Sequence, residues 1–130
     1  MTSPAPDTPR ATFRQAQRLG HNREYQAAYK LGARKIRGPL AVFGRPNGLR
    51  TSRLGLSVGR RVGPAVVRVR LKRMLREAFR LQRGSLPPGY DLVVTVRPHR
   101  PLPLAEYRRL LASAWESLDR EWKRRAEPKP

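Results

Sequence analysis

The stretch formed by residues 57–82 constrains the fold most, because it joins a glycine-bounded turn to a long pattern of helical period. At about 100° per residue, the apolar side chains of residues 64–83 fall on one arc, which predicts a helix packed against a core. They are Val67, Leu71, Met74, Leu75, Ala78 and Leu81. The opposite arc carries Arg68, Lys72, Arg73, Arg76, Arg80 and Arg83. We expect one side of this helix to face a core and the other side to face a polyanion.

The composition indicates which polyanion. The chain has 29 Lys and Arg residues against 9 Asp and Glu, a formal net charge of +20, and such a charge repels itself unless a partner neutralises it. Nucleic acid is the commonest partner of this kind. A membrane surface is the alternative, but the basic residues are not confined to one amphipathic helix, and no apolar run approaches the roughly 18 residues of a membrane span. Because only Glu77 opposes nine basic side chains between residues 60 and 83, we favour phosphate contact over a merely solvated helix face.

The composition also argues against several function classes. Without cysteine the chain can have no disulfide, zinc knuckle or thiol chemistry. Its N-terminus lacks the apolar segment of a signal peptide, so a cytoplasmic protein is expected. The 9 carboxylates form no Asp-x-Asp or Glu-x-x-His cluster, and His21 and His99 are predicted to be solvated residues of polar loops. We therefore expect no catalytic side chain and identify no metal ligand.

One domain with loose ends is expected. Residues 1–15 are rich in Pro, Ser and Thr and should be disordered, as should residues 126–130, which leaves a domain at residues 16–125. Asn22 and Gly32 are suitable caps for a short first helix. A long amphipathic helix is predicted from Leu104 to Trp122, where apolar residues recur at helical spacing.

Three strands are predicted, at residues 39–44, 53–59 and 90–96. Asn47-Gly48 favours a tight turn, so the first two strands are expected to be antiparallel neighbours. The basic helix separates the second strand from the third, which indicates that these two run parallel.

One face of the predicted sheet carries little bulk. Phe43 lies out of phase with the apolar residues beside it, so it should point to the same face as Ser57. Such a face suits an open groove, in which an unpaired strand of nucleic acid stacks on rings while arginines hold its phosphates. Tyr25 and Tyr29 are candidates for the same groove, and the alternative, that both are ordinary core residues, stays open.

The segment SVGRRVGPAVVRVRLKRMLREAFR resembles the signature of the bacterial ribonuclease P protein component, which is usually written around an Arg-Asn-Arg motif. Arg18-Leu19, Glu24-Tyr25, Tyr29 and the LAVF strand precede it in the matching order, and GYDLVVTVRP and an amphipathic helix follow. The resemblance covers about residues 13–122. Val69 stands where the family has Asn, so contacts made by that amide are lost here. We expect assembly with RNA to survive on the flanking arginines.

The resemblance implies a fold and a role. The fold is an α/β (α+β) sandwich, a small mixed sheet of about four strands and three helices, with a left-handed βαβ crossover that the usual right-handed preference would not predict. The role is that of accessory subunit of a ribonucleoprotein endonuclease. Its catalytic RNA subunit uses Mg²⁺ to remove the 5′ leader of precursor tRNA, while the protein binds RNA and supplies no nucleophile.

The resemblance also implies binding sites and partners. RNA contacts are expected from Arg60, Arg61, Arg68, Arg70, Lys72, Arg73, Arg76 and Arg80. The leader cleft is expected to be lined by Tyr25, Tyr29, Phe43 and Ser57. The partners are then the RNA subunit and precursor tRNA, with no membrane, and Mg²⁺ is expected to be bound mainly by the RNA. A structural ribosomal or other rRNA-binding protein is the alternative function, and a DNA-compacting protein is a third.

Overall fold

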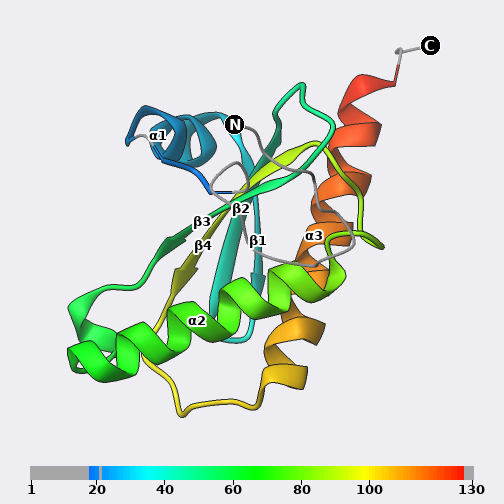
Figure 1. Ribbon diagram of the computed structural model, residues 1–130. Coiled ribbons are helices and arrows are strands. Elements are labelled where there is room, and N and C mark those ends of the chain that lie inside the picture. Colours follow the sequence, from blue (N-terminus) through cyan, green and yellow to red (C-terminus); the bar gives the residue numbers. More distant parts are fainter. Residues whose placement is uncertain (1–17, 21, 128–130) are drawn as a thin grey trace, which may run out of the picture.

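The computed structural model describes residues 18–20 and 22–127 (Figure 1). Within them, three α-helices and a four-stranded sheet form the α+β fold. The elements are α1 (Asn22–Leu31), β1 (Ala33–Arg37), β2 (Leu40–Pro46), β3 (Arg53–Ser57), the 3₁₀ turn η2 (Arg60–Val62), α2 (Ala65–Gln82), β4 (Tyr90–Val96) and α3 (Leu104–Ala126). The tail expected at residues 1–15 lies outside the described residues, as do residues 128–130 of the other tail.

The sheet has the strand order β1-β2-β4-β3. β2 pairs antiparallel with both β1 and β4, whereas β3 pairs parallel with β4. Because α2 connects β3 to β4, the predicted parallel pair and its helical crossover are confirmed. The left-handed sense expected for this crossover stays a prediction.

The predicted hairpin between β2 and β3 is wrong, because β4 lies between these two strands. Gly48 does adopt the left-handed φ, +74°, that the Asn-Gly dipeptide favours. However, the backbone N–H of Asn47 donates to Gly89 O at 2.9 Å, and its side-chain Nδ2 donates to Asp91 Oδ1 at 2.9 Å. Both acceptors lie at the start of β4, so the connection of residues 47–52 carries the chain past the end of β4 to its far edge.

β1 is a strand that the sequence pattern does not predict. Three of its five residues are basic (ARKIR), so it lacks the apolar alternation of a half-buried strand. It pairs with β2 along its whole length, and Lys35 Nζ lies 2.8 Å from the Glu121 carboxylate on α3. Cross-strand and tertiary contacts, more than local propensity, form this edge strand.

α2 and α3 cover one face of the sheet, and α1 covers part of the other face (Figure 1). On the first face, the rings of Phe79 and Trp115 stack with centroids 5.3 Å apart and planes 8° apart, and both residues are fully buried. This contact joins α2 to α3 at the centre of the larger core. A smaller core on the α1 side contains the buried residues Leu19, Ala28 and Val93. The aromatic groove expected on that face is therefore not wholly open.

Each long helix buries one stripe of side chains. α2 buries Leu71, Leu75, Ala78, Phe79 and Gln82. The predicted inward stripe is partly wrong, because Val67 and Leu81 are 36% and 40% exposed and Phe79 is inward instead. The predicted C-terminal helix is confirmed, with Tyr107, Leu110, Leu111, Ala114, Trp115 and Leu118 buried. No helix in the described part of the chain has the length and apolar character that crossing a membrane needs.

Candidate nucleic-acid interface

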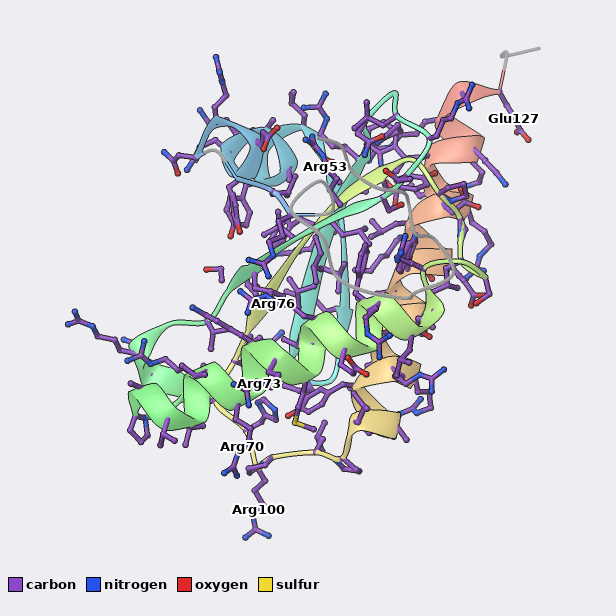
Figure 2. All side chains as sticks on the ribbon, in the orientation of Figure 1. Arg53, Arg70, Arg73, Arg76, Arg100 and Glu127 are labelled. Atoms are coloured by element: carbon purple, nitrogen blue, oxygen red, sulfur yellow. The ribbon has the colours of Figure 1, made fainter. Side chains whose placement is uncertain are left out.

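The basic residues of α2 are spread over its outer face and both flanks. Figure 2 shows Arg73 at the middle of the helix, Arg76 on the side nearer α1, and Arg70 on the opposite side, nearer Arg100. This order follows from helical geometry, because each step of three residues turns back by about 60° around the axis. Arg70 and Arg73 are exposed, whereas Arg76 is half-buried. The residues predicted to contact RNA therefore belong to more than one surface.

Four of the remaining predicted RNA contacts lie near the two ends of this helix or directly before it, and the fifth, Lys72, lies one turn before Arg76. Arg60 and Arg61 are exposed in η2, directly before α2. Arg68 is half-buried, and its Nε donates to Gly63 O at 3.0 Å. Arg80 pairs with Glu77 one turn earlier, and this hydrogen bond raises the pKa of Arg80 and lowers the pKa of Glu77. Part of the charge of Arg80 is thus already balanced within the helix.

A cationic pocket of about 190 Å³ lies between α2, β3 and the segment before α1. Its lining residues are Arg18, Leu19, Tyr25, Leu54, Leu56, Lys72 and Arg76. The lining contains three cations and no carboxylate. Burial, followed by repulsion from the Arg18 guanidinium, lowers the pKa of Arg76. This excess of positive charge in a concave site favours an anion such as a phosphate group.

Three of the four predicted cleft residues come together on the α1 side of the sheet. The rings of Tyr29 and Phe43 meet edge to face with centroids 4.9 Å apart. Tyr25 Oη accepts a hydrogen bond from Leu56 N at 3.2 Å, at the outer edge of β3. A Cβ on Gly55 would lie only 2.7 Å from the Tyr25 ring. Gly55 therefore makes room on this face for a packed helix.

Ser57, the fourth predicted cleft residue, lies on the same face of the sheet but one row of residues beyond this aromatic cluster. The pairing register places Phe43, Val93 and Gly55 in one row across the sheet. The next row consists of Ile36, Ala41, Thr95 and Ser57. Ser57 is exposed and Ile36 is 42% exposed. We call this second row the open row, because it continues the face away from the aromatic cluster under α1.

A charged cluster clamps α1 to the sheet. Arg53 makes a bidentate contact with Asp91, with Nε to Oδ1 at 2.8 Å and Nη2 to Oδ2 at 2.7 Å. Its Nη1 lies 3.0 Å from Glu24 Oε2 on α1. The hydrogen bond to Asp91 raises the pKa of Arg53. Glu24 directly precedes Tyr25, so the clamp sets where the aromatic cluster lies.

The sequence prediction missed this clamp, although one signal was present. Asp91 lies inside an apolar strand, and a carboxylate at such a position is almost never buried without a partner. The partner itself could not be identified, because Arg53 and Glu24 lie in distant parts of the chain.

The described carboxylates do not fit a magnesium site of the protein's own. Within residues 18–20 and 22–127, no group of three His, Asp or Glu side chains could hold a metal ion. Glu24 and Asp91 share Arg53, and Glu121 accepts a bond from Lys35. Mg²⁺ needs near-octahedral oxygen ligation, which these paired carboxylates do not offer.

The prediction for His99 is partly wrong, because His99 lies in a loop as expected but is held by two contacts, whereas His21 lies outside the described residues. His99 is half-buried, with Nε2 2.7 Å from Tyr107 Oη and Nδ1 2.7 Å from Arg97 O. Because the Arg97 carbonyl can only accept, Nδ1 carries the proton, and Nε2 accepts from the tyrosine hydroxyl. His99 is therefore a fixed part of the connection between β4 and α3.

Comparisons with known proteins agree with this fold. The chain matches the family model described as Ribonuclease P over residues 13–119. The ribonuclease P protein component of Shouchella clausii is 41% identical over 98 residues, which are 74% of this chain and 80% of that relative. The solved RNase P protein from Thermotoga maritima is 32% identical with a TM-score of 0.71, over 77% of this chain and 96% of that chain.

A second solved structure has a similar fold. The RNase P protein of Staphylococcus aureus is 28% identical with a TM-score of 0.68, over 84% of this chain and 97% of that chain. The match to the family model extends from before α1 into α3 and so includes the whole sheet. This confirms the fold class and the family that the central motif indicates. The chain belongs to the ribonuclease P protein family.

Proposed function

We propose that this protein contacts two RNAs through adjoining surfaces: the catalytic RNA subunit through the outer face of α2, and the unpaired 5′ leader of precursor tRNA through the α1 side of the sheet. The protein component is the accessory subunit of ribonuclease P, the ribonucleoprotein endonuclease that removes tRNA 5′ leaders. This family membership sets aside the ribosomal and DNA-compacting alternatives. The contribution of this chain is binding.

Contact with the RNA subunit is supported by the charge of the outer face. Arg70 and Arg73 are exposed there, and Val69, which is 54% exposed, directly precedes Arg70. Exposed guanidiniums bind phosphate oxygens in a bidentate manner without giving up a protein partner. The valine adds no hydrogen bond, so affinity at this face comes mainly from phosphate contacts and depends on salt.

Contact with the leader is supported by one observation above all, the open row beside the cationic pocket. An unpaired strand presents both phosphates and flat bases, so it needs cations next to a shallow, partly apolar floor. Lys72 and Arg76 supply the cations, and Ile36 and Thr95 are part of the floor. Tyr25 connects the cationic pocket to the sheet, because it lines the pocket and packs on the sheet.

The chemical step and its metal ions belong to the RNA in this proposal. The described carboxylates form no cluster that fits Mg²⁺, and Mg²⁺ bound by RNA would neutralise the charge that develops at the cleaved phosphate. A cytoplasmic location is part of the proposal and is supported by the absence of cysteine.

The leader proposal is tested by adding a negative charge to the open row. Ser57→Glu in the reconstituted holoenzyme should weaken binding of precursor tRNA with a leader by about tenfold, through repulsion of phosphates, and leave binding of mature tRNA unchanged. Ala105→Glu, on α3 across the sheet, is the matched control and should change neither. A titration of leader length measures both affinities. An equal loss for precursor and mature tRNA would show that the open row does not hold the leader.

A further inference from the structure

A small apolar pocket lies on the flank of α2 that faces away from α1. Its cavity volume is about 60 Å³, and its walls come from the first turns of α2 and from the connection between β4 and α3. Val67, Met74 and Pro101 supply apolar walls, with Tyr107 and His99 beside them. The pocket opens at the edge of the larger core, because Leu71 and Tyr107 belong to both, and it is not part of the proposed leader surface.

The polar groups of the pocket are already used within the protein. The Tyr107 hydroxyl accepts from Leu102 N at 3.2 Å and meets His99 Nε2 at 2.7 Å. The other ring nitrogen of His99 bonds to Arg97 O, and the two rings meet edge to face at 5.8 Å. His99 therefore offers the pocket a fixed aromatic surface and no free nitrogen. An occupant would be held by ring and methyl contacts rather than by a hydrogen bond or a metal ion.

The rim of the pocket is apolar and positively charged at the same time. Arg70 lines the pocket, and Figure 2 shows Arg70 and Arg100 extending from α2 and from the β4–α3 connection on the same side of the molecule. Val67 in the pocket wall and the neighbouring Val69 are 36% and 54% exposed. No carboxylate lines the pocket. Exposed apolar side chains that adjoin an apolar pocket and an arginine mark a candidate surface for a partner that contacts both.

A nucleotide suits both the apolar part and the positively charged part of this surface. Its base is flat and apolar on its faces, and its phosphate is an anion that a guanidinium at the rim can bind. A second copy of this chain would instead bring another net charge of +20 to the same place. The pocket is large enough for the edge of one ring, so a single unpaired base is the occupant that fits.

We propose that this pocket receives one unpaired nucleobase of the RNA subunit, which packs against Val67, Met74 and the His99 ring while its phosphate binds Arg70. The inference rests on the proposed contact between α2 and the RNA subunit and adds a base contact to it. Phosphate contacts hold RNA irrespective of sequence, whereas an inserted base fixes the register of the protein on its RNA.

The test fills the pocket without changing charge. Val67→Phe should weaken binding of the RNA subunit by about tenfold, within the usual range for one lost base contact, and should leave the salt dependence of binding unchanged. Val66→Phe is the matched control, because it adds the same ring to an adjacent exposed valine that does not line the pocket. Chemical probing of unpaired bases should find one base protected by the wild type and by Val66→Phe but reactive with Val67→Phe.

Two further readouts keep the proposal testable. Val67→Thr has nearly the same shape as the wild type, so it serves as the test if Val67→Phe does not fold. Its hydroxyl would lie in an apolar site and should weaken binding of the RNA subunit by about threefold. Equal affinities and equal base protection for Val67→Phe and Val66→Phe would overturn the proposal and leave the α2 contact intact. A change of oligomeric state with unchanged RNA affinity would assign the pocket to contacts between copies and also overturn it. Loss of RNA-subunit binding by the wild type itself would overturn the α2 contact as well.

Discussion

At the scale of single residues, Gly55 and Tyr25 together determine the shape of the candidate leader surface. The Tyr25 ring occupies the space where any larger residue at position 55 would place its Cβ. The tyrosine hydroxyl also accepts the Leu56 N–H at the outer edge of the sheet, where an unpaired strand edge would otherwise be open to other chains. Tyr25 therefore packs α1 and protects the β3 edge while its surface lines the cationic pocket.

Gly55→Ala is predicted to displace α1. The added methyl group should lower the free energy of unfolding by about 1–3 kcal/mol, as overpacking typically does, and urea denaturation measures the change. Gly59→Ala is the matched control, since no atom lies within 4 Å of a Cβ there. If both variants unfolded at the same urea concentration, the close contact with Tyr25 would not be a constraint in solution.

The direction in which a single side chain faces could be predicted for some residues and not for others. Phe43 was predictable, because a period of two leaves only one choice of face. Val67 was not, because it lies at the border of the apolar arc, and the stacking of Phe79 on Trp115 decides how α2 is rotated. The contacts of His99 could not be predicted either, because the hydroxyl that holds its ring belongs to Tyr107 on α3.

At the scale of elements, the position of α1 depends on the charged clamp as well as on its apolar stripe. Ala28 is buried on the sheet, yet Tyr25 and Tyr29 are only half-buried. Arg53, held in place by its bidentate contact with Asp91, therefore helps to define the position of this short helix through its ion pair with Glu24.

Arg53→Met is predicted to loosen α1, because it leaves the nearly buried Asp91 carboxylate without its cation. We expect a loss of about 3 kcal/mol in the free energy of unfolding and faster amide hydrogen exchange throughout α1. Arg109→Met is the control. It removes an exposed pair with Glu106 within α3 and should leave both measurements unchanged. Slow exchange in α1 of the Arg53 variant would show that apolar packing alone holds the helix.

A separate prediction concerns the outer face of α2 and the salt dependence of RNA binding. Arg73→Gln should lower the slope of log affinity against log salt concentration for the RNA subunit by about one unit, because one phosphate contact is lost. Arg124→Gln, at an exposed position of α3, should not change the slope. Filter binding at several salt concentrations measures both. An unchanged slope for Arg73→Gln would remove this residue from the RNA interface.

The helices could be predicted from the sequence more completely than the sheet. The periods of α1, α2 and α3 are long enough to be recognised, and Asn22 and Gly32, the predicted caps, lie at the two ends of the first. β1 is too short and too basic to be recognised. The neighbour of β3 depends on hydrogen bonds from Asn47 to residues that come about 40 positions later, which no local pattern contains.

At the scale of the whole molecule, the net charge of +20 opposes folding, and the few carboxylates offset it locally. Glu121 is an example, because it ties the edge strand β1 to α3 through Lys35. Each carboxylate that becomes protonated removes such a tie and adds to the net positive charge. The free protein should therefore be more sensitive to acid than to alkali.

The pair of Glu121 and Lys35 provides a test. The hydrogen bond from Lys35 lowers the pKa of Glu121 in the folded protein. The folded state therefore binds fewer protons than the unfolded chain, and the stability from this pair is present above the unfolded pKa of about 4.3 and lost as the pH falls. Glu121→Gln should flatten the fall in unfolding free energy between pH 5 and pH 3, as measured by urea denaturation. Glu116→Gln, an exposed change in α3, should leave the slope as in the wild type.

The strand order has a consequence for synthesis. Among the strands of the described residues, β4 is the last to be made, yet it alone pairs with β3 and it lies in the interior of the sheet, between β2 and β3. A nascent chain that ends before Tyr90 can close the hairpin of β1 and β2, but β3 has no strand to join and α2 has no α3 to pack on. On the ribosome, the arginine-rich helix thus emerges before the interior that will anchor it, next to a surface of rRNA.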